Sequence, residues 1–220
     1  MPVSTDSGAA APVAAPVARG DRGRIGAWWL VAVLVFGLAL GVGGGLVIPH
    51  FTKPADDSAE AGFLRDMSTH HAQAVEMSMI AHADSDDPRI VTLAGDIALT
   101  QHGQIGYMQA WLRDWGLSPT GSQPAMAWMP DSAGSVVNGL MPGMATPEQI
   151  NKLREAKGKD LEVQYLTLMR QHHLGGIHMA QEILNLSKNK DVTWLAQTMV
   201  NSQQAELTVI NDMLQKLGAA

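Results

Sequence analysis

The sequence of 220 residues contains no cysteine. Without cysteine there is no disulfide framework, no thiolate metal site and no lipid attached through a thiol. A metal site in this chain would have to use imidazole, thioether or carboxylate ligands instead. The lack of cysteine leaves the cellular compartment open, so other features must indicate it.

Positive charge and aromatic side chains are also scarce. The formal net charge is -6 and aromatic residues make up 5% of the chain. A protein that binds nucleic-acid phosphates would carry an excess of basic residues, so we expect no nucleic-acid partner. The chain also lacks the Glu-x-x-His pairs of di-iron bundles, the His-Glu-x-x-His motif of zinc proteases and the glycine motifs of nucleotide sites. These absences favour a protein that is not an enzyme, and we predict no catalytic residue.

One long apolar segment stands near the N-terminus. Residues 25–48 carry no charge and could cross a bilayer core of about 30 Å. Arg19, Arg22 and Arg24 precede this segment, whereas only Lys53 closely follows it, and basic residues mark the cytoplasmic side. We therefore expect a disordered cytoplasmic tail over 1–24, a single-pass anchor in the cell membrane over 25–48 and an extracytoplasmic linker over 49–59. A cleaved signal peptide is the rival interpretation, although its apolar region is usually about 7 to 15 residues long.

Glycines repeat at every fourth position of the apolar segment. Gly37, Gly41 and Gly45 would share one face of a helix, where small residues let two helices approach closely. This spacing is compatible with a homodimer or with a membrane-protein partner.

The chain after residue 59 has the apolar spacing of packed helices. Asp87 and Pro88 are typical of a helix start, and Gly116 follows the last seam residue of the first pair of helices. Thr146 and Gln149 form a predicted capping box around Pro147, so the helical pattern resumes there. We expect a first hairpin over 60–116, a methionine-rich connection over 117–146 and a second hairpin over 147–218.

The two predicted hairpins align with each other without a gap. A constant offset of 102 residues (172 minus 70) relates Met67 to Met169, His70 to His172, His71 to His173, Met77 to Met179, Gln101 to Gln203, and Gln104 to Glu206. Such a match indicates a duplicated helical hairpin. Two hairpins of this kind bury their apolar stripes against each other, so the sequence predicts an all-α four-helix bundle with an approximate twofold axis, which we expect over 60–218.

Polar residues interrupt the apolar stripes of all four helices at a similar level. Buried polar groups need partners, and two interpretations of this layer remain open. Imidazoles and amides can form a structural hydrogen-bond network, or the layer can bind a metal. The predicted metal ligands are Met67, His70, His71, Met77, Met169, His172, His173, Met179 and Glu206. Residues predicted to support them are Gln101, Gln104, Gln203, His102 and His178.

The supply of methionine favours copper over harder metals. Every methionine except Met1 and every histidine except His50 follows residue 59. Thioether sulfur suits Cu(I) and imidazole suits copper, zinc and iron, so copper is the predicted metal. Four further methionines, Met126, Met129, Met141 and Met144, lie in the connection. Filling of irregular gaps is the favoured interpretation of these four, and a second Cu(I) site is the alternative.

The stretches "FLRDMSTHHAQAVEMSMIA" and "LMRQHHLGGIHMAQ" resemble the family known as domain of unknown function 305. The resemblance covers about residues 60–217 and rests on the paired Met-x-x-His-His motifs. It implies a ferritin-like four-helix bundle, usually exported or membrane-anchored, with some relatives linked to copper binding and copper resistance. His102 departs from the family pattern, and Gln104 stands where the second half has Glu206, so the two halves need not bind metal equally.

These observations lead to three hypotheses about function. The first is a membrane-anchored extracytoplasmic copper-binding protein that sequesters or delivers the ion. The second is a structural or assembly subunit of a membrane complex, in which the polar layer is only a hydrogen-bond network. The third is a ferritin-like redox enzyme. The sequence does not separate storage from delivery, and it identifies no protein partner.

Overall fold

The computed structural model describes residues 27–130, 132 and 134–219. Within these residues the chain forms six helices and no strand, which confirms the predicted all-helical class. The helices are α1 (Ala27–Thr52), α2 (Ala59–Asp84), α3 (Pro88–Asp114), α4 (Pro147–Glu155), α5 (Gly158–Leu186) and α6 (Lys190–Leu217). The chain divides into two compact units, Met1–Thr52 and Lys53–Ala220.

Helix α1 is the described part of the first unit. Its large apolar side chains, from Trp28 to Val42, are exposed. Among the described residues, no helix reaches the combination of length and hydropathy that a membrane crossing requires. The predicted anchor over 25–48 therefore gains no support from the structure. The predicted tail over 1–24 lies outside the described residues.

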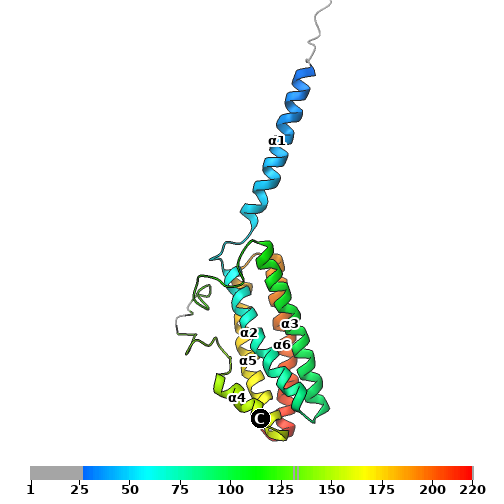
Figure 1. Ribbon diagram of the computed structural model, residues 1–220, viewed down its shortest axis with the longest axis vertical. Helices are drawn as coiled ribbons and strands as arrows, with labels where there is room; N and C mark the ends of the chain where they lie inside the picture. Colours follow the sequence, from blue (N-terminus) through cyan, green and yellow to red (C-terminus); the bar gives the residue numbers. More distant parts are fainter. Residues whose placement is uncertain (1–26, 131, 133, 220) are drawn as a thin grey trace, which may run out of the picture. The chain divides into compact units, whose positions relative to one another are not determined.

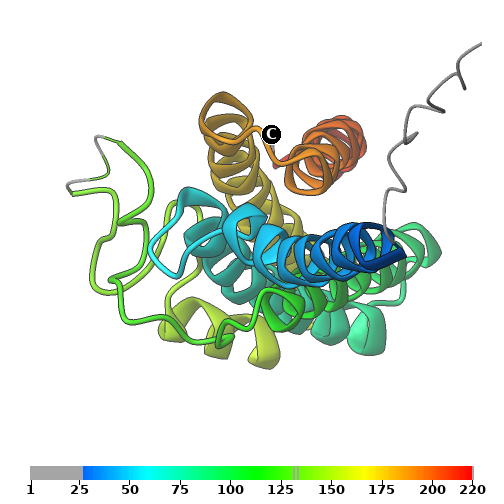
Figure 2. The ribbon, with the colours of Figure 1, turned by 90° about the horizontal axis from the view of Figure 1, so that it is seen from above.

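The second unit is built from two hairpins. Helix α2 packs along α3, α5 packs along α6, and the two pairs meet where α2 contacts α5. Figure 1 shows these four long helices side by side, and Figure 2 shows α2 and α3 on one side with α5 and α6 on the other. The short helix α4 contacts α5 and α2. Residues 115–146 connect the hairpins outside the four long helices.

Local sequence signals define where these helices begin. The Asp87 carboxylate accepts a hydrogen bond of 2.8 Å from the backbone N–H of Arg89, and Pro88 occupies the first turn of α3. Thr146 and Gln149 form the predicted capping box at the start of α4. In this box each side chain satisfies a backbone N–H that the first helical turn leaves without a partner.

Two hydrophobic clusters fill the bundle. One contains Phe63 and Met67 of α2 together with Met179 and Ile183 of α5. The other contains Ala74 and Met77 of α2 together with Leu161, Tyr165, Leu166 and Met169 of α5. The N-terminal part of α2 thus packs with the C-terminal part of α5, so the two helices run antiparallel. The His-His pair of each helix lies between the two clusters.

Candidate metal site

Four histidines form the centre of the layer between the clusters. His70, His71, His172 and His173 have exposed fractions of 0 to 1%. The rings of His70 and His172 contact each other across the α2–α5 interface, with centroids 3.7 Å apart and planes inclined by 35°. Neighbouring residues on a helix point about 100° apart. His71 therefore turns toward α3 and His173 toward α6, and we call these four residues the histidine layer.

Each ring of the histidine layer is anchored through Nε2. The Nε2–H of His71 donates to Gln104 Oε1 at 2.7 Å, and that of His173 donates to Glu206 Oε2 at 2.5 Å. In the central pair, His70 donates to the backbone carbonyl of Pro142 at 3.0 Å. His172 donates to the backbone carbonyl of His70 at 2.9 Å.

These contacts determine which nitrogen of each ring carries the proton. A carbonyl or carboxylate oxygen only accepts, so Nε2 must be the protonated nitrogen of a neutral imidazole. The other nitrogen, Nδ1, then keeps a lone pair. All four Nδ1 atoms are buried and have no hydrogen-bond partner. Metal-binding histidines commonly show this division, with one ring nitrogen held by an oxygen and the other free to bind.

Two glutamines add further unpaired groups. Gln101 and Gln203 are each 2% exposed, and neither atom of the Gln101 amide has a partner. The Oε1 atom of Gln203 is also unpaired. Together with the four Nδ1 atoms, these are the buried side-chain nitrogen and oxygen atoms without a partner among the described residues. Gln203 lies against Gly176, where any larger residue would bring a Cβ within 2.7 Å of Oε1.

Burial keeps the rings of His70, His71 and His172 neutral. Loss of hydration lowers the pKa of His70 to about 4, although its hydrogen bond with Pro142 opposes the shift. Burial and the neighbouring His70 ring lower the pKa of His71 to about 3. The pKa of His172 is also well below its usual range, first because of burial and then because of the surrounding histidines. Neutral imidazole is the form that binds metal.

The predicted methionine ligands flank the histidine layer on both sides. Met67 and Met179 belong to one hydrophobic cluster, Met77 and Met169 to the other, and all four are fully buried. No group of three or more His, Asp or Glu side chains within the described residues is arranged to hold a metal ion. The structure thus contains unpaired ring nitrogens but no preformed site of three such ligands.

Other predicted residues take different positions. Glu206 is hydrogen-bonded to the histidine layer and its side chain is 18% exposed. His102 and His178, which we predicted as supporting residues, have exposed side chains and do not join the buried histidine layer. Met126, Met129 and Met141 of the connection are buried in the first cluster, and Met144 packs against it. They fill gaps in that cluster, as the favoured interpretation expected.

Sequence patterns did not reveal that part of the connection closes the histidine layer. This segment, residues 141–145, is called the strap. The Gln73 side chain hydrogen-bonds both backbone groups of Ala145, at 2.9 and 2.7 Å. The carbonyl of Pro142 accepts from His70 and lies so close to Gly175 that a Cβ there would be 2.0 Å from it. Gly143, at φ +81°, and Gly175 make this close approach possible, and glycine at these two positions was the one hint in the sequence.

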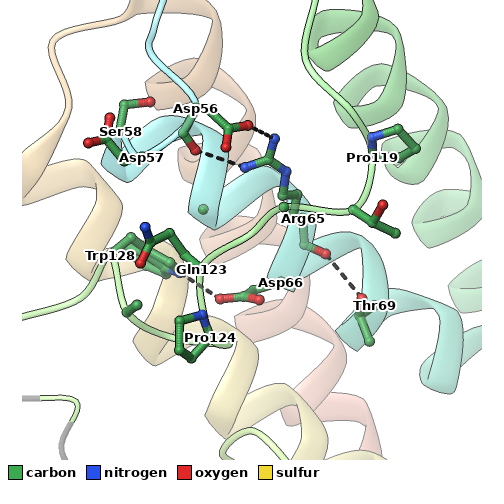
Figure 3. A pocket seen from close by; sticks show the side chains of 14 residues that line it. Asp56, Asp57, Ser58, Arg65, Asp66, Thr69, Pro119, Gln123, Pro124 and Trp128 are labelled. Carbon is green, nitrogen blue, oxygen red and sulfur yellow. Dashed lines mark hydrogen bonds and ion pairs between the residues drawn. The ribbon is translucent and has the colours of Figure 1, made fainter.

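A pocket of about 370 Å³ lies beside the start of α2 (Figure 3). The Arg65 guanidinium binds the Asp56 carboxylate and the carbonyl of Ser118, and Asp66 accepts from the Trp128 indole at 2.8 Å. Burial raises the pKa of the Asp66 carboxyl, opposed by hydrogen bonds from the backbone N–H of Met126 and from the Trp128 indole. None of the four histidines lines the pocket. Its polar contacts tie the linker and the connection to α2.

The comparisons with known proteins identify the family. Residues 60–214 match the family described as "Domain of unknown function (DUF305)". A crystal structure of a DUF305 protein from Streptomyces coelicolor is 46% identical, with a TM-score of 0.69, and the match covers 75% of this chain and 97% of that chain. A DUF305 fragment from Deinococcus radiodurans is 28% identical, with a TM-score of 0.60, over 72% of this chain and 96% of that chain.

More distant likeness extends to CopM. The structure of CopM in its Cu(II)-bound form is 22% identical, with a TM-score of 0.55, over 75% of this chain and 99% of that chain. This likeness shows a shared fold. No curated protein matches the chain. The match to the family over most of the chain, together with the similar structure from Streptomyces coelicolor, shows that this protein belongs to the DUF305 family.

Proposed function

We propose that the protein binds copper in the histidine layer and serves to sequester or deliver it. One observation carries the proposal. Four buried imidazoles are held by their Nε2–H groups, while all four Nδ1 lone pairs lack a partner. Buried polar atoms without partners are rare in folded proteins, and a metal ion would give these lone pairs the partner that the protein itself does not supply.

The chemistry of the surroundings favours Cu(I) within this proposal. Thioethers from four buried methionines lie in the clusters on either side of the rings. Cu(I) is a soft ion that accepts imidazole and thioether ligands and tolerates low coordination numbers. Structural zinc sites are almost always four-coordinate, and di-iron sites need several carboxylates. The described residues offer no cluster of three or more His, Asp or Glu ligands, so these two metals fit less well.

The likeness to CopM agrees with this assignment but does not carry it. CopM is known in Cu(I)-bound, Cu(II)-bound and Ag-bound forms. At 18 to 22% identity the comparison bears on the fold alone, so the assignment to this chain rests on its own histidines.

The alternatives have weaker support. A purely structural network would be expected to pair its own polar atoms, whereas this one leaves seven buried atoms without partners. No observation on the described residues favours a redox enzyme over a binding protein. Location outside the cytoplasm is a further proposal, which rests on Arg19, Arg22 and Arg24 preceding the apolar segment. Accessibility of the bundle to an external protease in intact cells tests it.

Copper titration of the purified chain tests the central proposal. We expect the parent protein to compete with a colorimetric chelator for Cu(I) and the variant His70→Ala/His172→Ala to lose at least tenfold in affinity, because this variant removes the central ring pair. The matched control is His102→Ala/His178→Ala, which removes two exposed histidines and should bind like the parent.

Folding of each variant is checked by circular dichroism and thermal unfolding. His71→Gln/His173→Gln serves as a second pair, since glutamine keeps a polar side chain next to Gln104 and Glu206. If both folded layer variants bind Cu(I) as tightly as the exposed-histidine control, copper binding in the histidine layer is wrong.

A further inference from the structure

The two outer histidines have partners at equivalent positions that differ in charge. His71 and Gln104 are 33 residues apart, and so are His173 and Glu206. In each pair the Nε2–H donates to a side-chain oxygen on the next helix, at 2.7 Å for the amide and 2.5 Å for the carboxylate. The duplicated hairpin therefore repeats the geometry and changes one formal charge.

This difference places one carboxylate beside the histidine layer, at Glu206, and an amide at the equivalent position 104. An imidazole that binds a metal ion is neutral, so the ligand rings add no charge to the site. Among the described residues, Glu206 is the carboxylate that hydrogen-bonds to a histidine of the layer. Glutamine at 104 contributes no charge. An ion entering the layer thus meets one counter-charge.

The charge of the layer limits what it can bind. Transfer of an ion from water to a buried site is costly unless an opposite charge or several dipoles compensate it. One monovalent ion beside Glu206 leaves the layer neutral, whereas a second monovalent ion or one divalent ion leaves an uncompensated positive charge. A carboxylate that accepts from a ligand histidine also makes that imidazole a stronger donor, which favours the ring of His173 over that of His71.

We propose that Glu206 makes the histidine layer a site for one monovalent soft cation, held in the half formed by α5 and α6 and with His173 as a ligand. This inference rests on the proposed copper function and adds its stoichiometry, its ion charge and the residue that sets both. Gln104 is then the reason why the half formed by α2 and α3 does not take a second ion. Glu206 acts as a positioning residue, since it acts through His173.

Three variants measured with Cu(I) alone, under anaerobic conditions and against a competing chelator, test the inference. We expect the parent to bind one Cu(I) tightly. Glu206→Gln should bind about 10 to 100 times more weakly, the range typical for loss of a residue that supports a metal ligand. Gln104→Glu should bind a second Cu(I), because it supplies the missing charge in the other half.

The double variant Glu206→Gln/Gln104→Glu provides the decisive control. It keeps one carboxylate in the layer but moves it to the other half, so affinity for one Cu(I) should return to within a few fold of the parent. A loss caused by damaged packing near α6 would not be rescued by a change on α3. Asp212→Asn, an exposed change on α6, is the control for surface charge and should bind like the parent.

The measured stoichiometry and affinities distinguish a failure of this inference from a failure of the proposed copper binding. Tight binding of two Cu(I) ions by the parent, or an unchanged affinity in folded Glu206→Gln, overturns the role of Glu206 while copper binding stands. Failure of the double variant to recover affinity also overturns it. A parent chain that does not bind Cu(I) at all overturns both.

Discussion

The two hairpins of the bundle descend from one pattern but meet the connection differently. Position 73 in α2 and position 175 in α5 are related by the same offset as the histidines. Gln73 holds the strap by hydrogen bonds to Ala145, whereas Gly175 makes room for the carbonyl of Pro142. The strap occurs once, so it cannot share the twofold symmetry of the hairpins. Each hairpin therefore contacts the strap through a different residue type at the equivalent position.

The comparison teaches that the symmetry of the contacts persists within each hairpin and is lost where α2 meets α5 and the strap. His71 and His173 keep equivalent partners on the neighbouring helix. His70 and His172 do not: one donates to the strap at Pro142 and the other to the backbone of α2. The central pair is therefore where the two halves differ most in their contacts.

Acid should produce the largest loss of stability, because it affects buried rings in both halves. A histidine whose pKa is lower in the folded state binds fewer protons there than in the unfolded chain, so the free energy of unfolding falls as the pH drops. For His70 the loss begins near pH 6.5, is complete by about pH 4 and amounts to about 3 kcal/mol at about 1.4 kcal/mol per pKa unit. His71 extends the window to about pH 3.

Urea denaturation of the metal-free protein between pH 7.5 and 4 measures this loss. The variant His71→Gln removes one of the titrating rings, so its free energy of unfolding should depend less steeply on pH. The variant His82→Gln removes an exposed ring and should keep the parental dependence. A parent whose stability is constant between pH 7 and 4 would contradict the buried neutral rings.

Gly175→Ala should give the next largest loss of stability. It disturbs the contact of the second hairpin with the strap and leaves the contact of the first hairpin intact. The new Cβ would lie 2.0 Å from the carbonyl oxygen of Pro142, so the backbone of the strap or of α5 must shift. Overpacking of this kind costs about 1 to 3 kcal/mol. Gly103→Ala is the matched control, because no atom lies within 4 Å of its new Cβ. Helical Gly→Ala at such an open position should stabilise by about 0.5 to 1 kcal/mol.

Urea midpoints of the two glycine variants decide this prediction. Equal stabilisation of both would mean that the strap does not press on α5.

Thr146→Ala should have the smallest effect and tests how the second half begins. Helix α2 starts with a side-chain cap at Ser58, whereas Lys157 at the start of α5 makes no such bond. In the second half the capping box stands at the start of α4, the short helix that precedes α5. Loss of the Thr146 cap should cost about 1 kcal/mol and increase hydrogen exchange in α4 more than elsewhere. Thr100→Ala, at an exposed position within α3, should leave exchange in α4 unchanged.

The helices and the histidine layer were predictable because both depend on periodic spacing. The cap at Asp87 and the box at Thr146 follow from local rules that act within a few residues. The gathering of His71 with Gln104 follows from the register of a hairpin. Such features need no knowledge of distant parts of the chain.

The contacts of the connection could not be predicted in the same way. Residues 115–146 have no repeating spacing, so nothing in the sequence says which backbone carbonyl meets His70. The same applies to Met126 and Met141, whose burial depends on how the connection lies across the helices. His102 and His178 were misleading because chemical type alone does not say which face of a helix a residue occupies.

The hydrogen bond from His172 to the backbone carbonyl of His70 also fixes the position of α5 along the axis of α2. A ring on α5 that reaches a main-chain oxygen of α2 can do so at one alignment of the two helices, since a step of one residue moves that oxygen by about 1.5 Å along the axis. Apolar contacts alone would tolerate several alignments of a duplicated hairpin on its copy. This polar contact forms at only one of these alignments and stabilises it over the others, so the hairpins dock in a single register.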